Sequence, residues 1–228
     1  MEKDCTKLEE RAGYVFRDIK HLKTALTHSS FVNENKNRNL SDYERMEFLG
    51  DAVLELSVSE YLYEHLPDAH EGELTKLRSS LVCEPTLAMC AAEIDLKEFI
   101  RLGKGEELTG GRNRDSIISD VFEAVIGAIY LDGGIDEARA FIKRFVLEDM
   151  YHKIEFTDSK SALQEYIQEK GYTLFYELVS ESGPAHKKDY IMAAVIDGDA
   201  IAKGHGGSKK AAEQEAAYKA LKILRSRK

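Results

Sequence analysis

Two apolar runs of helix length carry acidic residues at positions where a buried helix would be apolar. In YERMEFLGDAVLEL, Glu44, Glu47 and Asp51 are spaced i, i+3 and i+7. In SIISDVFEAVIGAIYL, Asp120 and Glu123 are spaced i and i+3. Residues three, four or seven apart share one face of an α-helix, so each run predicts an apolar helix with one acidic stripe.

The two acidic stripes need a positive partner. An ionised carboxylate among apolar side chains is costly, and it either shifts its pKa or is paired. Arg45 is the only Lys or Arg within the two runs, so we expect the two helices to face each other and to share divalent cations. Because the stripes offer oxygen ligands and no His or Cys, Mg²⁺ or Mn²⁺ is expected rather than zinc. The alternative is that both stripes are solvated faces, as is usual for acid-rich helices.

Charge and cysteine content limit the classes of partner. Residues 157–228 carry 12 Lys and Arg against 10 Asp and Glu, which leaves 20 against 31 for residues 1–156. An acidic first half repels a polyanion unless cations intervene, whereas the second half can contact phosphates. Cys5, Cys83 and Cys90 form no CxxC pair, which favours reduced thiols in a cytoplasmic protein. Without a run of membrane-spanning length, no membrane partner is expected.

The first half of the chain is predicted to be helical throughout. Helices are predicted at 43–65, 73–82, 85–94, 115–131 and 135–150. The segment LGKGEELTGGRNRD lacks the GxxxxGK[ST] phosphate-binding pattern and follows no strand, so we interpret it as a mobile connector. Helical periodicity lapses between about 151 and 158, which indicates a linker.

The second half changes period. A helix is predicted at 160–170, strands at 173–180, 190–196 and 200–204, and a last helix at 208–224. The order α-β-β-β-α predicts a small antiparallel sheet with two helices on one side.

The sequence GHGGSKKAAEQEAA has the features of an anion site. Gly206 and Gly207 permit close backbone approach to a ligand, and Ser208 can cap the last helix. The free amides of the first turn, with Lys209 and Lys210, then face an anion such as phosphate. The alternative is an ordinary solvated basic face.

A second polar group of the same half suits a ribose-rich surface. Ser161, Gln164 and Gln168 form a stripe on the 160–170 helix, and His186 lies in the loop GPAHKK. Such side chains can meet ribose hydroxyls in the shallow minor groove of duplex RNA.

These segments carry a family resemblance. YERMEFLGDAVLEL, EGELTKLRSSLV and SDVFEAVIGAIYLDGG resemble the signature segments of bacterial ribonuclease III, and residues 159–227 resemble its double-stranded RNA-binding domain. The resemblance implies an all-α nuclease domain at 1–152, a linker at 153–158 and a small α+β (α-β-β-β-α) double-stranded RNA-binding domain at 159–228.

The resemblance also implies roles for individual residues. Glu47, Asp51, Asp120 and Glu123 match the Mg²⁺ site, with Asp51 and Glu123 in catalytic positions and Mn²⁺ as a possible substitute ion. Glu44 and Glu71 match supporting positions. The matches to duplex-contacting positions are Ser161, where many relatives have Thr, Gln164, Gln168, His186, Lys209 and Lys210.

The activity implied is Mg²⁺-dependent endonucleolytic hydrolysis of double-stranded RNA. The expected products have 5′-phosphate and 3′-hydroxyl ends with short 3′ overhangs, and the expected role is rRNA and mRNA processing by a cytoplasmic homodimer. A twofold dimer supplies one site to each strand of a duplex.

Two other functions stay open from the residues alone. One is an RNA-binding regulator whose first half is only a dimerisation scaffold. The other is a helical Mg²⁺ enzyme acting on a small pyrophosphate substrate, although the chain lacks a DDxxD-type run and this function leaves the second half unexplained.

Overall fold

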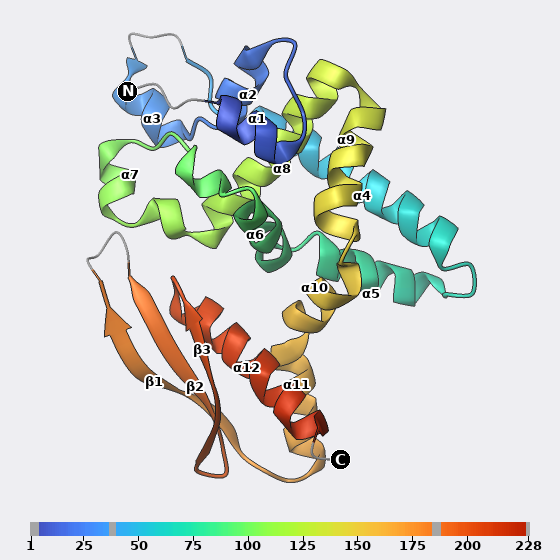
Figure 1. The fold of residues 1–228 in the computed structure, drawn as a ribbon, viewed down its shortest axis with the longest axis vertical. Helices are drawn as coiled ribbons and strands as arrows, with labels where there is room; N and C mark the ends of the chain where they lie inside the picture. Colours follow the sequence, from blue (N-terminus) through green and yellow to red (C-terminus); the bar gives the residue numbers. More distant parts are fainter. Residues whose placement is uncertain (1–4, 37–39, 184–187, 227–228) are drawn as a thin grey trace. The chain divides into compact units, whose positions relative to one another are not determined.

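The structure, a computed structural model, describes residues 5–36, 40–183 and 188–226. The chain divides into two compact units, the first ending at Met150 and the second beginning at Tyr151 (Figure 1). In its described residues the first unit is helical, apart from an isolated bridge between Thr27 and Arg101. The second contains a three-stranded sheet. The predicted fold class, an all-α part followed by α-β-β-β-α, is confirmed.

The first unit contains nine α-helices in its described residues and three shorter helical turns. The helices are α1 (Thr6–Ala12), α2 (Ile19–Ala25), α3 (Ser29–Glu34), α4 (Glu44–His65), α5 (Glu71–Leu81), α6 (Glu84–Glu93), α7 (Lys104–Leu108), α8 (Asp115–Gly133) and α9 (Ile135–Ile142). The turns are 3-10 helical at η2 (Leu96–Glu98) and η3 (Gly111–Asn113) and π-helical at η4 (Lys143–Leu147).

Helix α4 begins and ends close to the predicted residues. The Asp42 carboxylate accepts a hydrogen bond from the Glu44 amide at 3.3 Å, which satisfies a free amide of the first turn. Pro67 lies two residues beyond His65, where the helix ends. The Asp42 hydrogen bond thus lies just before the N-cap residue, Tyr43, and the proline follows the last turn of the helix.

Helix α8 is the central helix of the first unit. Most of its side chains are buried, including Phe122, Val125 and Ile126, which are fully buried. Helices α2, α4, α6 and α9 pack around it. A helix that is apolar on nearly every face is stable only inside a core, so the acids of α8 are held at the edge of that core.

The glycine-rich segment differs from the predicted connector. It forms α7 and the η3 turn, because distant residues satisfy its backbone. The Glu34 carboxylate accepts hydrogen bonds from the amides of Lys104 and Gly105 at 2.9 and 3.2 Å. Arg112 donates to the carbonyl of Ile100 at 3.0 Å.

The segment predicted as a linker, 153–158, also differs. Helix α10 (Met150–Thr157) covers all but its last residue. The predicted helix 135–150 is divided into α9 and the π-helical turn before α10 begins. The periodicity lapses here because α10 is held by polar and aromatic contacts with α12 (Lys209–Ser226), described below.

The second unit packs two helices on one face of its sheet (Figure 1). Strands β1 (Leu174–Ser182), β2 (Asp189–Ile196) and β3 (Asp199–Gly206) pair antiparallel in the order β1-β2-β3. Helix α12 lies against β2 and β3, and α11 (Ser159–Glu169) packs on α12.

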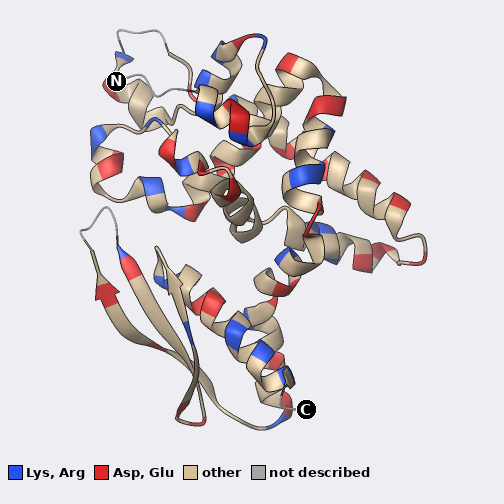
Figure 2. Ribbon diagram, viewed as in Figure 1, with Lys and Arg blue, Asp and Glu red and all other residues tan. Residues whose placement is uncertain are grey.

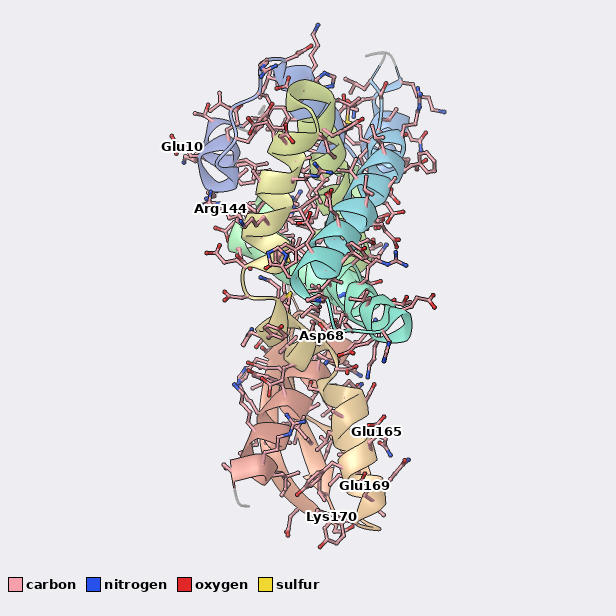
Figure 3. All side chains as sticks on the ribbon, turned by 90° about the vertical axis from the view of Figure 1, so that its right-hand side faces the viewer. Glu10, Asp68, Arg144, Glu165, Glu169 and Lys170 are labelled. Carbon is pink, nitrogen blue, oxygen red and sulfur yellow. The ribbon has the colours of Figure 1, made fainter. Side chains whose placement is uncertain are left out.

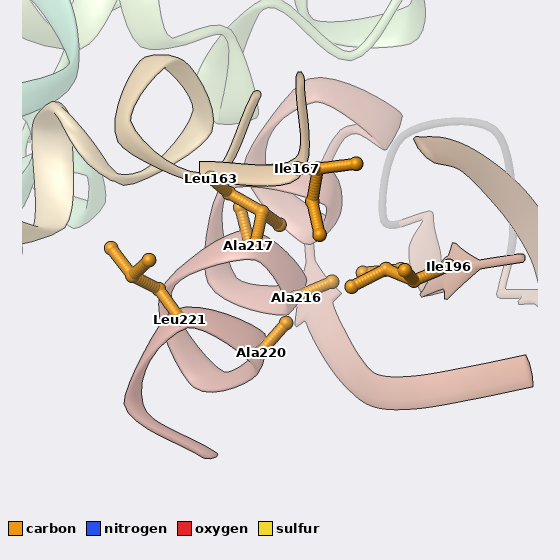
Figure 4. Packing of buried hydrophobic residues seen from close by; sticks show 8 residues of the cluster. Leu163, Ile167, Ile196, Ala216, Ala217, Ala220 and Leu221 are labelled. Atoms are coloured by element: carbon orange, nitrogen blue, oxygen red, sulfur yellow. The ribbon is translucent and has the colours of Figure 1, made fainter. Parts of the chain in front are cut away.

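The core of the second unit is small and alanine-rich (Figure 4). Leu163 and Ile167 of α11 meet Ile196 of β2 and the buried alanines of α12. A Cβ on Gly204 of β3 would lie 2.1 Å from the carbonyl oxygen of Ala212, so only glycine permits this approach of strand to helix.

In the described ranges, no helix combines the length and the apolar character needed to cross a membrane.

Candidate functional site

Helices α4 and α8 touch through their backbones at two glycines. A Cβ on Gly50 would lie 1.8 Å from the carbonyl oxygen of Glu123, and one on Gly127 would lie 2.3 Å from the carbonyl oxygen of Met46. Neither position has room for a side chain. Because Glu47 and Asp51 flank Gly50 on α4, the contact brings the α4 acids against Glu123 of α8.

The acidic side chains of the two helices interact as one group, which we call the acidic cluster: Glu44, Glu47, Asp51, Asp120 and Glu123. Burial raises the pKa of Glu47 to about 7, helped by repulsion from Asp120, Glu44 and Asp51. Burial likewise raises the pKa of Glu123 to about 8, with repulsion from Asp51, Asp120 and Glu47. The structure therefore brings together the two stripes that the spacing predicted.

Asp120 is held by a buried tyrosine. The Tyr43 hydroxyl donates to Asp120 Oδ2 at 3.3 Å, and Tyr43 as a residue is 4% exposed. Burial and repulsion from Glu84 raise the pKa of Asp120, while the Tyr43 hydrogen bond and His28 act in the opposite direction. The carboxylate is thus oriented from one side.

Members of the cluster differ in exposure. Glu44 and Asp51 are exposed, whereas Glu47, Asp120 and Glu123 are half-buried. Glu71 lies outside the cluster. It is the exposed first residue of α5, which follows the carboxyl end of α4. The α4 acids lie at the opposite end of that helix, in its first three turns.

Four residues around the cluster were not predicted from the sequence: His28, Tyr43, Glu55 and Glu84. Glu55 lies one turn beyond Asp51 on the same helix face and repels the charge of Glu123, so its spacing could have revealed it. Tyr43 opens the first acidic run, four residues before Glu47, so its spacing also places it on the face of the acids. His28 and Glu84 come from outside the two acidic runs, and no spacing relates them to the acids.

The cluster has the chemistry of a hard-cation site. As the side chains stand, no three His, Cys, Asp or Glu of the described residues are close enough to form a ready-made metal cage. The donors are nonetheless all carboxylate oxygens, and burial opposes the charge of three of them, Glu47, Asp120 and Glu123. A divalent cation that prefers oxygen ligands, such as Mg²⁺, fits this donor set because it neutralises the opposed charges.

The predicted anion site lies where β3 meets α12. Ser208 Oγ accepts a hydrogen bond from the Ala211 amide at 3.2 Å, and Lys209 and Lys210 are exposed in the first turn of α12. Figure 2 shows acidic as well as basic residues along α12. Helix α12 therefore carries charges of both signs.

The two glycines before this site have different surroundings. A Cβ on Gly206 would lie 2.6 Å from the Ala212 amide nitrogen, so this glycine serves contact with α12 rather than with a ligand. Gly207 has open space around it. Close approach by a ligand is thus retained only at Gly207.

The polar stripe of α11 faces solvent as predicted. Ser161, Gln164 and Gln168 are exposed, opposite the buried Leu163 and Ile167. Figure 3 shows that the labelled acids Glu165 and Glu169 also project outward from α11, and the predicted contact His186 lies outside the described residues.

Two family profiles match the chain. A profile described as Ribonuclease-III-like matches residues 18–150, and a profile described as Double-stranded RNA binding motif matches residues 159–224.

Individual relatives match nearly the whole chain. Ribonuclease 3 of Listeria welshimeri is 46% identical over 224 residues, which cover 97% of this chain and 98% of the relative. Ribonuclease 3 of Geobacillus kaustophilus is 48% identical over 227 residues, covering 96% of this chain and 91% of the relative.

A solved structure matches the helical part. The nuclease domain of ribonuclease III from Campylobacter jejuni, described as flexible in a region involved in dimer formation, superimposes with a TM-score of 0.60 at 41% identity. The match covers 64% of this chain and 98% of that domain.

Proposed function

The chain belongs to the ribonuclease III family, and from that premise we propose that it is an endoribonuclease that hydrolyses double-stranded RNA with Mg²⁺, for which Mn²⁺ can substitute. The products carry 5′-phosphate and 3′-hydroxyl ends with short 3′ overhangs. The substrates are precursors of rRNA and mRNA in the cytoplasm. The observation that carries this proposal is the acidic cluster at the contact of α4 and α8.

Four acids of the cluster hold the cation: Glu47, Asp51, Asp120 and Glu123. When bound, Mg²⁺ lowers the pKa of an attacking water and stabilises the charge of the departing 3′ oxygen. Asp51 and Glu123 are the catalytic pair, because they lie on facing helices beside the glycine contact. The buried Tyr43 hydroxyl orients Asp120. Orientation of a ligand by an outer hydrogen bond strengthens such sites.

The remaining acids act toward the substrate. Glu44 is exposed in the first turn of α4 and extends the cluster outward. Glu71 lies away from the cluster of its own chain, so its supporting role is toward RNA rather than toward that metal site.

The second unit holds the duplex. Lys209 and Lys210 at the start of α12 contact phosphate, and the stripe of Ser161, Gln164 and Gln168 meets ribose hydroxyls. His186, which follows β1 in the sequence, belongs to the same set. The match to a double-stranded RNA binding motif supports this assignment.

A homodimer completes the enzyme. Helix α4 carries large apolar side chains that are exposed in the single chain: Phe48 is 80%, Leu56 56% and Tyr63 76% exposed. Their spacing of eight and seven residues puts them along one face of the helix. A twofold contact through this face buries them and supplies one acidic cluster to each RNA strand.

The test is Glu123→Gln in the full-length protein. We expect cleavage of a simple RNA duplex in Mg²⁺ to fall by at least about a thousandfold. The substitution removes a charged ligand of the cation. Duplex binding, measured in EDTA, should stay within about twofold, since the proposed phosphate and ribose contacts lie in the second unit and Glu123 is distant from them in the sequence. The matched control is Glu10→Gln, which changes an exposed acid of α1 outside the cluster.

Three results would contradict the proposal. Full cleavage by Glu123→Gln in metal-controlled buffer would remove Glu123 from catalysis. If the protein without substitutions binds duplex RNA but never cleaves it in Mg²⁺ or Mn²⁺, it is an RNA-binding regulator. If it acts on pyrophosphate substrates but not on RNA, it is the helical Mg²⁺ enzyme.

A further inference from the structure

A carboxylate of α12 holds the turn between β3 and α12. Glu215 lies less than two helical turns after Lys209, and its Oε2 accepts a hydrogen bond from the backbone amide of His205. Its Oε1 lies 3.0 Å from Nζ of Lys219. Burial acts to raise the pKa of Glu215, but the hydrogen bonds from His205 and Lys219 outweigh it and lower the pKa. Glu215 is therefore an anion at neutral pH.

Two further contacts fix the same turn. Gly206 approaches α12 so closely that a Cβ would lie 2.6 Å from the Ala212 amide nitrogen. Ser208 Oγ accepts from the Ala211 amide at 3.2 Å. The turn thus enters α12 in one defined conformation, with Lys209 and Lys210 directly after it. A preorganised turn loses less conformational freedom when it binds a ligand.

The neighbours of Glu215 have other partners. Glu213 pairs with Lys160 of α11 at 2.7 Å, and the Gln214 side-chain amide donates to the Thr157 carbonyl at 3.0 Å. Of these three consecutive polar residues, Glu215 alone contacts the end of β3. The negative charge of Glu215 lies near the first turn of α12 and opposes phosphate binding there. A surface that bound phosphate by electrostatic attraction alone would not carry an acid at this position.

We propose that Glu215 is a positioning residue for duplex binding. It holds the His205 amide and thereby fixes the turn that aims Lys209 and Lys210 at RNA phosphate. This inference rests on the proposed function of the second unit and adds a residue that does not itself touch RNA.

The experiment compares two substitutions in the full-length protein. Glu215→Ala removes both the hydrogen-bond acceptor and the charge, whereas Glu215→Gln keeps an acceptor oxygen and removes only the charge. Electrostatics alone predicts that both variants bind RNA more tightly. A positioning role predicts that Glu215→Ala binds RNA about tenfold more weakly, which is the loss expected for one charge-assisted hydrogen bond of a preorganised turn. It also predicts that Glu215→Gln binds RNA at least as tightly as the unchanged chain.

Binding is measured by fluorescence anisotropy of a labelled blunt RNA duplex in EDTA at fixed salt. Lys219→Ala is the matched control, because it removes the ion pair of Glu215 and keeps the His205 hydrogen bond; we expect a change of no more than about twofold. Hydrogen exchange should accelerate at the His205 amide in Glu215→Ala and stay unchanged in the amides of β2, which separates a local effect from unfolding.

The outcomes distinguish the inference from the proposed function. If Glu215→Ala binds as tightly as the unchanged chain, or Glu215→Gln weakens binding as much as Glu215→Ala, the inference is overturned and the proposed function stands. If exchange accelerates throughout β2, the role is structural and the inference is also overturned. Failure of the unchanged chain to bind duplex overturns both.

Discussion

Tyr43 shows how one buried side chain orders a partly exposed acidic cluster. Its hydroxyl donates to one oxygen of Asp120, which restricts rotation of the carboxylate and so orients the second oxygen. The ring centre of His28 lies 5.7 Å from that of Tyr43, and His28 Nδ1 is itself engaged by the Ser30 amide at 3.1 Å. The geometry of an α8 acid therefore depends on a residue before α4 and on the start of α3.

Asp132 is a second carboxylate with several partners, and it couples folding to pH. It accepts the Tyr14 hydroxyl at 2.6 Å and the amides of Arg17 and Asp18 at 2.8 Å each. Burial acts to raise the pKa of Asp132, but these hydrogen bonds outweigh it and lower the pKa. A lowered pKa in the folded state gives stability that is complete above the unfolded pKa of about 4 and is lost as pH falls through the folded value.

We expect Asp132→Asn to reduce the free energy of unfolding of the first unit by about 1–2 kcal/mol at pH 7, because it loses part of a charged acceptor. The difference from the unchanged protein should begin to shrink as pH falls below about 4, where Asp132 of the unfolded state takes up a proton, and should vanish once pH falls below the lower pKa of the folded state. Urea unfolding between pH 7 and pH 2.5 measures both effects. Asp68→Asn, at an exposed loop residue, is the control. A difference that stays constant with pH would exclude Asp132 as the titrating group.

Helices α4 and α8 show what the sequence can predict. The helix predicted at 43–65 is observed as α4 at Glu44–His65, and the acid spacing predicts which faces meet. The structure adds the glycine contact, which could not be predicted because Gly50 and Gly127 lie 77 residues apart and no local pattern pairs them.

Helices α7 and α10 show where local pattern is insufficient. Helix α7 depends on the Glu34 carboxylate, about 70 residues earlier in the chain. Helix α10 depends on Gln214 and Tyr218, about 60 residues later: the Phe156 and Tyr218 ring centres lie 5.4 Å apart. Short helices gain most of their stability from tertiary contacts, so their own residues do not reveal them.

Gly50→Ala tests whether the contact between α4 and α8 positions the acidic cluster. The new methyl group would meet a backbone carbonyl at 1.8 Å, so the two helices must separate. We expect a loss of about 3 kcal/mol or more in the free energy of unfolding. We also expect cleavage to fall about a hundredfold in the variant that remains folded, since a shift of about 1 Å in catalytic groups has that effect.

The control for this substitution is Gly72→Ala, because Gly72 lies within α5 and has no atom near its Cβ position. It should leave cleavage unchanged and stabilise the protein by about 0.4–1 kcal/mol. Denaturant unfolding and single-turnover cleavage measure the two quantities. Equal activity of Gly50→Ala and the unchanged enzyme would show that close backbone contact is not required for the cluster.

The division of the whole chain into two units places the boundary after the first residue of α10, so nearly all of this helix belongs to the second unit. The contacts of α10 within the second unit are specific: Gln214 donates to the carbonyls of Phe156 and Thr157, and Glu155 pairs with Arg225 at 3.4 Å. The predicted linker 153–158 is thus a helix with partners on α12. We propose that the RNA-binding unit begins at Tyr151.

Fragments of the second unit test this boundary. A fragment of residues 151–228 keeps α10, whereas one of residues 159–228 leaves the Gln214 amide without its carbonyl acceptors and exposes the Tyr218 ring. We expect the longer fragment to be more stable by about 2–4 kcal/mol, from two hydrogen bonds near 1 kcal/mol each and the aromatic contacts of Tyr218. Urea unfolding of both fragments measures the difference. In the longer fragment, Gln214→Ala should remove about half of this additional stability, because the aromatic contacts of Tyr218 remain. Equal stability of the two fragments would mean that α10 contributes nothing to the second unit and that the segment serves only as a connector, as its sequence alone predicts.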